Sequence, residues 1–127
     1  MSSQEKHDER VEHNKRFYDR VISYQFSDWE IVVSYYCAVH MIESALATMD
    51  KHPSSHQERR DMVIDSSPLI PQNVYKAYMK LEELSRNARY APDIDMTDVE
   101  LRFAQSKMDE ICRWYDGRRR QQASGRR

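Results

Sequence analysis

Apolar residues recur along the chain at spacings of three and four, the pattern of helices that turn one face toward a core. The clearest stripe is formed by Leu101, Ala104, Met108, Ile111 and Tyr115. Similar stripes, separated by breaks of which the last three contain proline, predict five helices. Their expected ranges are from within the first ten residues to Gln25, then 27–50, 55–64, 72–90 and 97–117.

The second predicted helix is apolar on most of its sides between Trp29 and Val39. A helix that is apolar all round is buried all round. We therefore expect this helix either to be the central helix of a bundle or to be a core helix that also supplies a dimer face.

Three capping boxes mark helix starts. In such a box a Ser or Thr side chain and a Glu three residues later satisfy free backbone N–H groups reciprocally. The pairs are Ser27 with Glu30, Ser55 with Glu58, and Thr97 with Glu100. Together with the stripes they predict an all-α fold, an antiparallel four- to five-helix bundle with one short lateral helix. The bundle is expected over residues 1–116, with residues 1–10 frayed and 117–127 a disordered basic tail.

The composition agrees with a helical domain, and the basic and acidic residues are unevenly distributed along the chain. The 127 residues include only two glycines, and 32% are charged. No apolar run approaches the roughly 20 residues that cross a bilayer, and the first 25 residues do not resemble a signal peptide, so we expect a cytoplasmic protein without membrane contact. Five of the 20 basic residues lie in the last eleven, whereas all 21 acidic residues precede them. This acidic body with a basic tail is not typical of a generally basic nucleic-acid binder, although the tail could attract RNA, DNA or an acidic partner.

The most suggestive polar residues are Arg86, Arg89 and Tyr90, because cations beside an aromatic ring can bind phosphate and stack a base. The same arginines could instead oppose the negative end of the helix dipole. Tyr36 and His40, four residues apart, share a helix face and are further candidates for a polar site; a buried core histidine is the alternative for His40.

No metal or cofactor site is predicted. His52 and His56 have a spacing of four, but Pro53 interrupts the helix between them. The chain has no GxGxxG, P-loop or GxSxG motif. Cys37 and Cys112 lie in apolar helical patterns and are interpreted as small buried hydrophobic residues.

Three segments together resemble the HEPN superfamily of small helical domains. They are Asp28–His40 with its paired tyrosines and histidine, the turn His52–His56, and Tyr78–Tyr90 with its Arg-x-x-Ala-x-Tyr-like end. The resemblance implies a four- or five-helix bundle, commonly a homodimer, that binds nucleic acid, a nucleotide or a partner protein. Such domains occur in toxin-antitoxin and antiviral systems, often near nucleotidyltransferases.

Active members of that superfamily are metal-independent ribonucleases that share an Arg-x4-6-His signature. Here no histidine follows Arg86 at that spacing, and Tyr90 is a poor base with its reference pKa near 10. We therefore expect no efficient ribonuclease activity unless His40 or His56 approaches Arg86 in space.

Three hypotheses follow. The first is a binding module, without cofactor or metal, that contacts RNA, a nucleotide or a partner protein through Arg86, Arg89, Tyr90, Tyr36 and His40. The second is a metal-independent ribonuclease with a rearranged site made of Arg86 with His40 or His56. The third is a structural partner of a protein encoded beside it, such as a nucleotidyltransferase.

Overall fold

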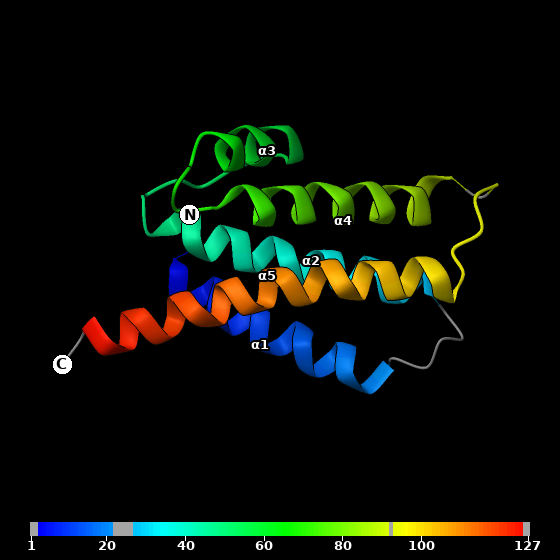
Figure 1. Cartoon of the computed structure of the whole chain (residues 1–127), viewed down its shortest axis with the longest axis horizontal. Helices are drawn as coiled ribbons and strands as arrows, with labels where there is room; N and C mark the ends of the chain where they lie inside the picture. Colours follow the sequence, from blue (N-terminus) through cyan, green and yellow to red (C-terminus); the bar gives the residue numbers. More distant parts are fainter. Residues whose placement is uncertain (1–2, 22–26, 92, 126–127) are drawn as a thin grey trace.

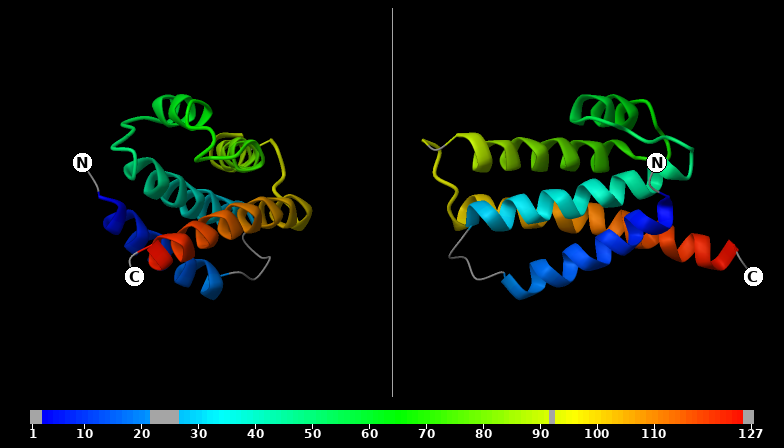
Figure 2. Two further views of the ribbon diagram at one scale, coloured as in Figure 1. Left: turned by 60° about the vertical axis from the view of Figure 1, so that its left-hand side comes forward. Right: turned by 180° about the vertical axis from the view of Figure 1, so that it is seen from behind.

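The computed structural model describes residues 3–21, 27–91 and 93–125, and within these ranges it is all-helical. The five helices are α1 (Gln4–Val21), α2 (Ser27–Ala47), α3 (His56–Ile64), α4 (Gln72–Tyr90) and α5 (Asp98–Gly125). Long helices α1, α2, α4 and α5 form an antiparallel bundle, and short α3 lies outside it alongside the first part of α4 (Figures 1 and 2). The all-α prediction is confirmed.

Helix α2 is the central element, because it packs against α1, α4, α5 and α3. Its buried face includes Ile31, Tyr35 and Ile42, which are fully enclosed. They meet Tyr78 and Leu81 of α4 in one continuous core. The expectation that the apolar second helix occupies the middle of the bundle is met.

The predicted caps explain two of the helix starts. The Glu58 amide donates to Ser55 Oγ at 3.1 Å and begins α3. At α5 the Thr97 amide donates to a Glu100 carboxylate oxygen at 2.9 Å, and the Val99 amide donates to Thr97 Oγ1 at 3.3 Å. Helix α2 begins at Ser27, as its capping box predicted.

Helix α1 begins at Gln4, within the first ten residues as predicted, and so includes residues 4–10, which were expected to fray. His7 and Val11 are buried, and Asp8 accepts hydrogen bonds from Ser44 Oγ and the Tyr115 hydroxyl, each at 2.6 Å. These tertiary contacts stabilise a segment whose local sequence is mostly polar. The predicted end of this helix at Gln25 lies outside the described residues.

The basic tail also departs from the prediction, since α5 continues as a helix through Gly117 to Gly125. The guanidinium of Arg119 donates to the Tyr115 hydroxyl at 3.1 Å and lies 3.9 Å from Asp8. One turn later Gln122 accepts from the Gln4 side chain at 2.9 Å. Contacts with α1 therefore extend the helix past a glycine that costs only about 1 kcal/mol.

Candidate functional site

A buried arginine links α3 to α2. Arg59 is 9% exposed, and its Nε and Nη2 reach Glu43 Oε1 at 2.9 and 2.8 Å. A buried guanidinium needs such a partner, because an isolated charge in the interior is strongly unfavourable. The pair therefore helps to hold α3 on the bundle, together with Val63 of α3, which is buried in the core.

A second buried carboxylate, Glu82 of α4, collects hydrogen bonds from two tyrosines. Its Oε2 accepts from the Tyr78 hydroxyl at 3.2 Å and from the Tyr35 hydroxyl at 3.4 Å. Burial raises the pKa of both phenols, and for Tyr35 the neighbouring Tyr78 contributes as well, so both hydroxyls stay protonated. The other oxygen, Oε1, lies 3.2 Å from Arg60 and 3.5 Å from Arg86.

His56 lies at the edge of this network, and its Nδ1 atom contacts two neighbouring polar groups. That atom is 3.0 Å from Arg59 Nη1 and 3.1 Å from the Tyr35 hydroxyl. An arginine can only donate, so Nδ1 must accept and the neutral ring carries its proton on Nε2. Burial, followed by the charge of Arg59, lowers the pKa of His56, which keeps the imidazole neutral near pH 7.

Arg89, near the end of α4, lies among aromatic rings. Its Nη1 donates to the Tyr36 hydroxyl at 2.9 Å. Its guanidinium carbon lies 5.1 Å from the ring centroid of Tyr90, 5.6 Å from that of Tyr36 and 5.8 Å from that of Tyr35. These contacts orient the group while leaving it next to an open pocket.

That pocket has a volume of about 220 Å³ and is lined by His56, Arg60, Glu82, Arg86, Arg89 and Tyr90. We call it the arginine pocket. Three guanidinium groups face one carboxylate among these lining residues, so the pocket has an excess of positive charge. The Tyr90 ring is 73% exposed and offers an aromatic face beside it. Such a site can hold an anion and stack a planar group.

The structure brings most of the predicted site residues together. Arg86, Arg89, Tyr90 and His56 line the arginine pocket, and Tyr36 is joined to it through its hydrogen bond with Arg89. Of the two histidines considered as partners of Arg86, His56 lines the same pocket as that arginine. His40 does not line this pocket but contacts α1 instead.

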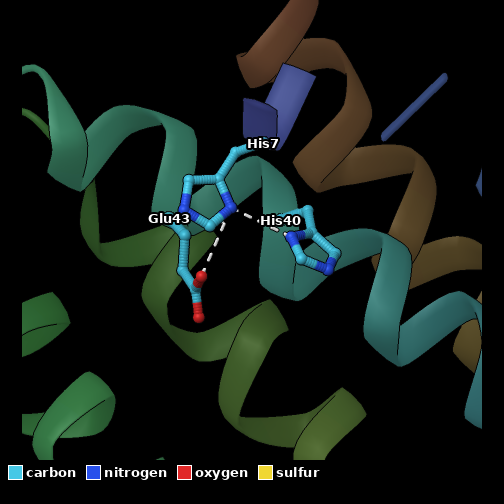
Figure 3. Close-up of side chains that lie close together, drawn as sticks. All are labelled: His7, His40 and Glu43. Carbon is cyan, nitrogen blue, oxygen red and sulfur yellow. Dashed lines mark hydrogen bonds and ion pairs between the residues drawn. The ribbon is translucent and has the colours of Figure 1, made fainter. Parts of the chain in front are cut away.

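His40 belongs to a separate group with His7 of α1 and Glu43 of α2 (Figure 3). His7 Nδ1 lies 3.0 Å from His40 Nδ1 and 3.4 Å from Glu43 Oε2. Burial lowers the pKa of both imidazoles, that of His40 to about 4, although Glu43 opposes the shift. The two rings are therefore neutral at pH 7.

Several of these residues were missed from the sequence. His7 lies in the stretch that was expected to fray, and no sequence pattern singled out Arg59, Arg60 or Glu82. The spacings of His40 with Glu43 and of His56 with Arg59, three residues each, place both members on one helix face and could have signalled them.

The two cysteines are free: Cys37 is buried and Cys112 half-buried. Burial raises the pKa of Cys37 to about 12 and that of Cys112 to about 11, which agrees with their interpretation as small hydrophobic residues. Among the described residues, no helix combines the length and apolar character that crossing a bilayer requires.

Comparisons with protein-family models, with curated proteins and with solved structures each found no match.

Proposed function

We propose that this chain is a HEPN-like helical domain that binds RNA or a nucleotide through the arginine pocket. The observation that carries the proposal is the convergence of Arg60, Arg86 and Arg89 with the exposed Tyr90 ring around one pocket. A phosphate group and its attached base need this pairing of cations and an aromatic face.

The arginines have different parts in this proposal. Arg89 is held in place by Tyr36 and the surrounding rings, so little side-chain entropy is lost when it contacts a phosphate. The Arg86 side chain is 54% exposed and only loosely paired with Glu82 at 3.5 Å, so it can turn toward a ligand. Stacking on Tyr90 would add about 1–3 kcal/mol per base.

We also propose that the domain forms a homodimer through an exposed face of α2. Trp29, Val33 and Tyr36 follow one another at spacings of four and three, and Trp29 is 64% exposed. Phe17 of α1 lies beside this stripe and is half exposed. A row of large apolar side chains at heptad spacing is typical of a helix that packs against a second copy.

The binding proposal is tested by fluorescence anisotropy with a labelled single-stranded RNA. Arg86→Ala/Arg89→Ala is expected to weaken binding at least tenfold, and Tyr90→Ala several-fold. A matched control, Arg102→Ala/Lys107→Ala on α5, removes the same charge from a surface away from the arginine pocket and should have a much smaller effect. Equal losses in both double variants would show that only net charge matters and would contradict the site.

A second candidate function, a metal-independent ribonuclease, is favoured by the neutral His56 imidazole in the same pocket as Arg86. His56 would accept the ribose 2′-hydroxyl proton at Nδ1 once the Arg59 guanidinium releases that atom, while Arg86 and Arg89 stabilise the phosphate. Labelled RNA incubated with EDTA should then be cleaved, and His56→Ala should lose the activity while His40→Ala keeps it. Absence of cleavage, or equal cleavage by both variants, excludes this activity.

Membership of a toxin-antitoxin or defence system follows from the HEPN resemblance and belongs to the same proposal. A cytoplasmic location stays a prediction.

A further inference from the structure

We propose that His7, His40 and Glu43 form a binding site for a divalent transition-metal ion, with Zn²⁺ the best matched. The three side chains come from α1 and α2 and point toward one another (Figure 3). One ligand atom from each lies within 4.8 Å of the other two. This site is separate from the arginine pocket and does not depend on the function proposed for it.

The separations of the ligand atoms fit one shared ion. In a tetrahedral zinc site with Zn–N bonds of about 2.0–2.1 Å, neighbouring ligand atoms lie about 3.3 Å apart. His7 Nδ1 is 3.0 Å from His40 Nδ1 and 3.4 Å from Glu43 Oε2. The third separation, between the ligand atoms of His40 and Glu43, is within 4.8 Å, so a shared ion would draw these two side chains closer together.

Glu43 is oriented for this task by Arg59. The guanidinium contacts Oε1 through both Nε and Nη2, while Oε2 is the oxygen nearest His7. Hydrogen-bonded partners behind a ligand fix its orientation in metal sites. The carboxylate is thus held on one oxygen and presents the other.

The site has an approach from solvent. His7 and His40 line a surface pocket of about 550 Å³ together with Lys6, Glu9, Arg10, His13 and Arg16. An ion could enter by this route, and a water molecule could supply a fourth ligand, as in sites with three protein ligands and one open position. The basic residues oppose entry of a cation but favour a hydroxide or another anion as the fourth ligand.

The donor set also selects the kind of metal. Two imidazoles and one carboxylate suit Zn²⁺ and related first-row ions, whereas Mg²⁺ and Ca²⁺ prefer oxygen ligands alone. Without a metal, the two neutral imidazoles would share one hydrogen bond. That purely structural role predicts no specific Zn²⁺ binding.

The test is Zn²⁺ titration of the full chain by calorimetry after EDTA treatment, with Mg²⁺ as a second titrant. The wild-type chain should bind one Zn²⁺ and no Mg²⁺. His7→Gln and His40→Gln should each weaken Zn²⁺ binding at least tenfold, while His13→Gln, which alters an exposed histidine of the same pocket, should bind like wild type. Circular dichroism checks that each variant keeps its helices.

A second measurement needs no variant. Co²⁺ bound in place of Zn²⁺ should give the visible absorption of a four-coordinate nitrogen and oxygen site, and added Zn²⁺ should remove it. Failure of the wild-type chain to bind Zn²⁺, or unchanged affinity in folded His7→Gln and His40→Gln, would overturn the proposal.

Discussion

At the scale of single residues, paired and exposed arginines have different energetic roles. Arg59 is buried against Glu43, whereas Arg86 is half exposed and loosely paired. Removing one partner of a buried pair leaves an uncompensated charge, but removing one partner of an exposed pair changes little. The same charge is therefore structural at Arg59 of α3 and available for binding at Arg86 of α4.

We predict that Arg59→Ala lowers the free energy of unfolding by about 3–5 kcal/mol, because Glu43 would lose its guanidinium partner in the interior. Arg86→Ala should lower it by less than about 1 kcal/mol. Urea unfolding followed by circular dichroism measures both values. The double variant Arg59→Met/Glu43→Leu should recover part of the loss, and no recovery would mean that lost packing, rather than the unpaired carboxylate, explains the single variant.

At the scale of helices, periodicity and caps predicted α2, α3 and α4 to within a few residues and placed the start of α1 within the first ten residues, but they ended the last helix at 117, whereas α5 continues to Gly125. Local sequence marks where Ser55 and Thr97 begin a helix. It contains no sign that Asp8 would meet Tyr115, or Gln4 meet Gln122, because these contacts depend on how α1 packs beside α5.

The residues of the arginine pocket also divide into those that the sequence could predict and those that depend on tertiary packing. Arg86, Arg89 and Tyr90 are close in sequence on one helix, so their association could be predicted. Glu82 precedes Arg86 by four residues on the same helix, so its spacing could have added it, whereas His56 and Arg60 come from α3 and join the site only through the packing of α3 on the bundle. Side-chain periodicity says which face is buried, but not which polar groups of different helices will pair.

Asp8 provides a test of how α1 is held. Its carboxylate accepts from Ser44 and Tyr115 and lies near Arg119, so Asp8→Ala leaves two hydroxyls and the α5 terminus without that acceptor. We expect a loss of about 1–3 kcal/mol and faster amide hydrogen exchange in the first turns of α1 and the last turns of α5. Protection of α4 amides should change only with global stability; uniform acceleration in all helices would contradict a local role for Asp8.

At the scale of the whole molecule, stability should depend on pH through histidines whose pKa is lowered by burial. In the folded state the pKa values of three histidines lie below the ordinary 6.5: His7, His40 and His56. The unfolded chain therefore binds more protons below about pH 6.5. This contribution is complete above that pH and is lost as the pH falls toward the folded values, that of His40 being about 4.

The free energy of unfolding in EDTA should then be lower at pH 5.0 than at pH 7.5 by about 1–2 kcal/mol. Urea unfolding at the two pH values measures the difference. His56→Gln should reduce the difference, because one group whose pKa is lowered by folding is gone. Equal stability of the wild-type chain at both pH values would contradict the linkage.

The proposed dimer would make RNA binding at the arginine pocket depend on the assembly of two chains. Tyr36 lies on the exposed α2 stripe with Trp29 and also holds Arg89 at the arginine pocket. If two copies pack through this stripe, each pocket borders the interface, and its affinity for RNA should depend on assembly. Light scattering should give twice the 15.3 kDa chain mass for the wild type.

Trp29→Glu should produce a monomer with weaker RNA binding, because a charge would be placed on the packed face. Val99→Glu is the matched control, since Val99 is equally exposed, at 68%, but lies at the start of α5. It should remain a dimer and bind RNA like wild type. A monomeric Trp29→Glu chain with unchanged RNA affinity would separate assembly from binding, and the arginine pocket would then act within one chain.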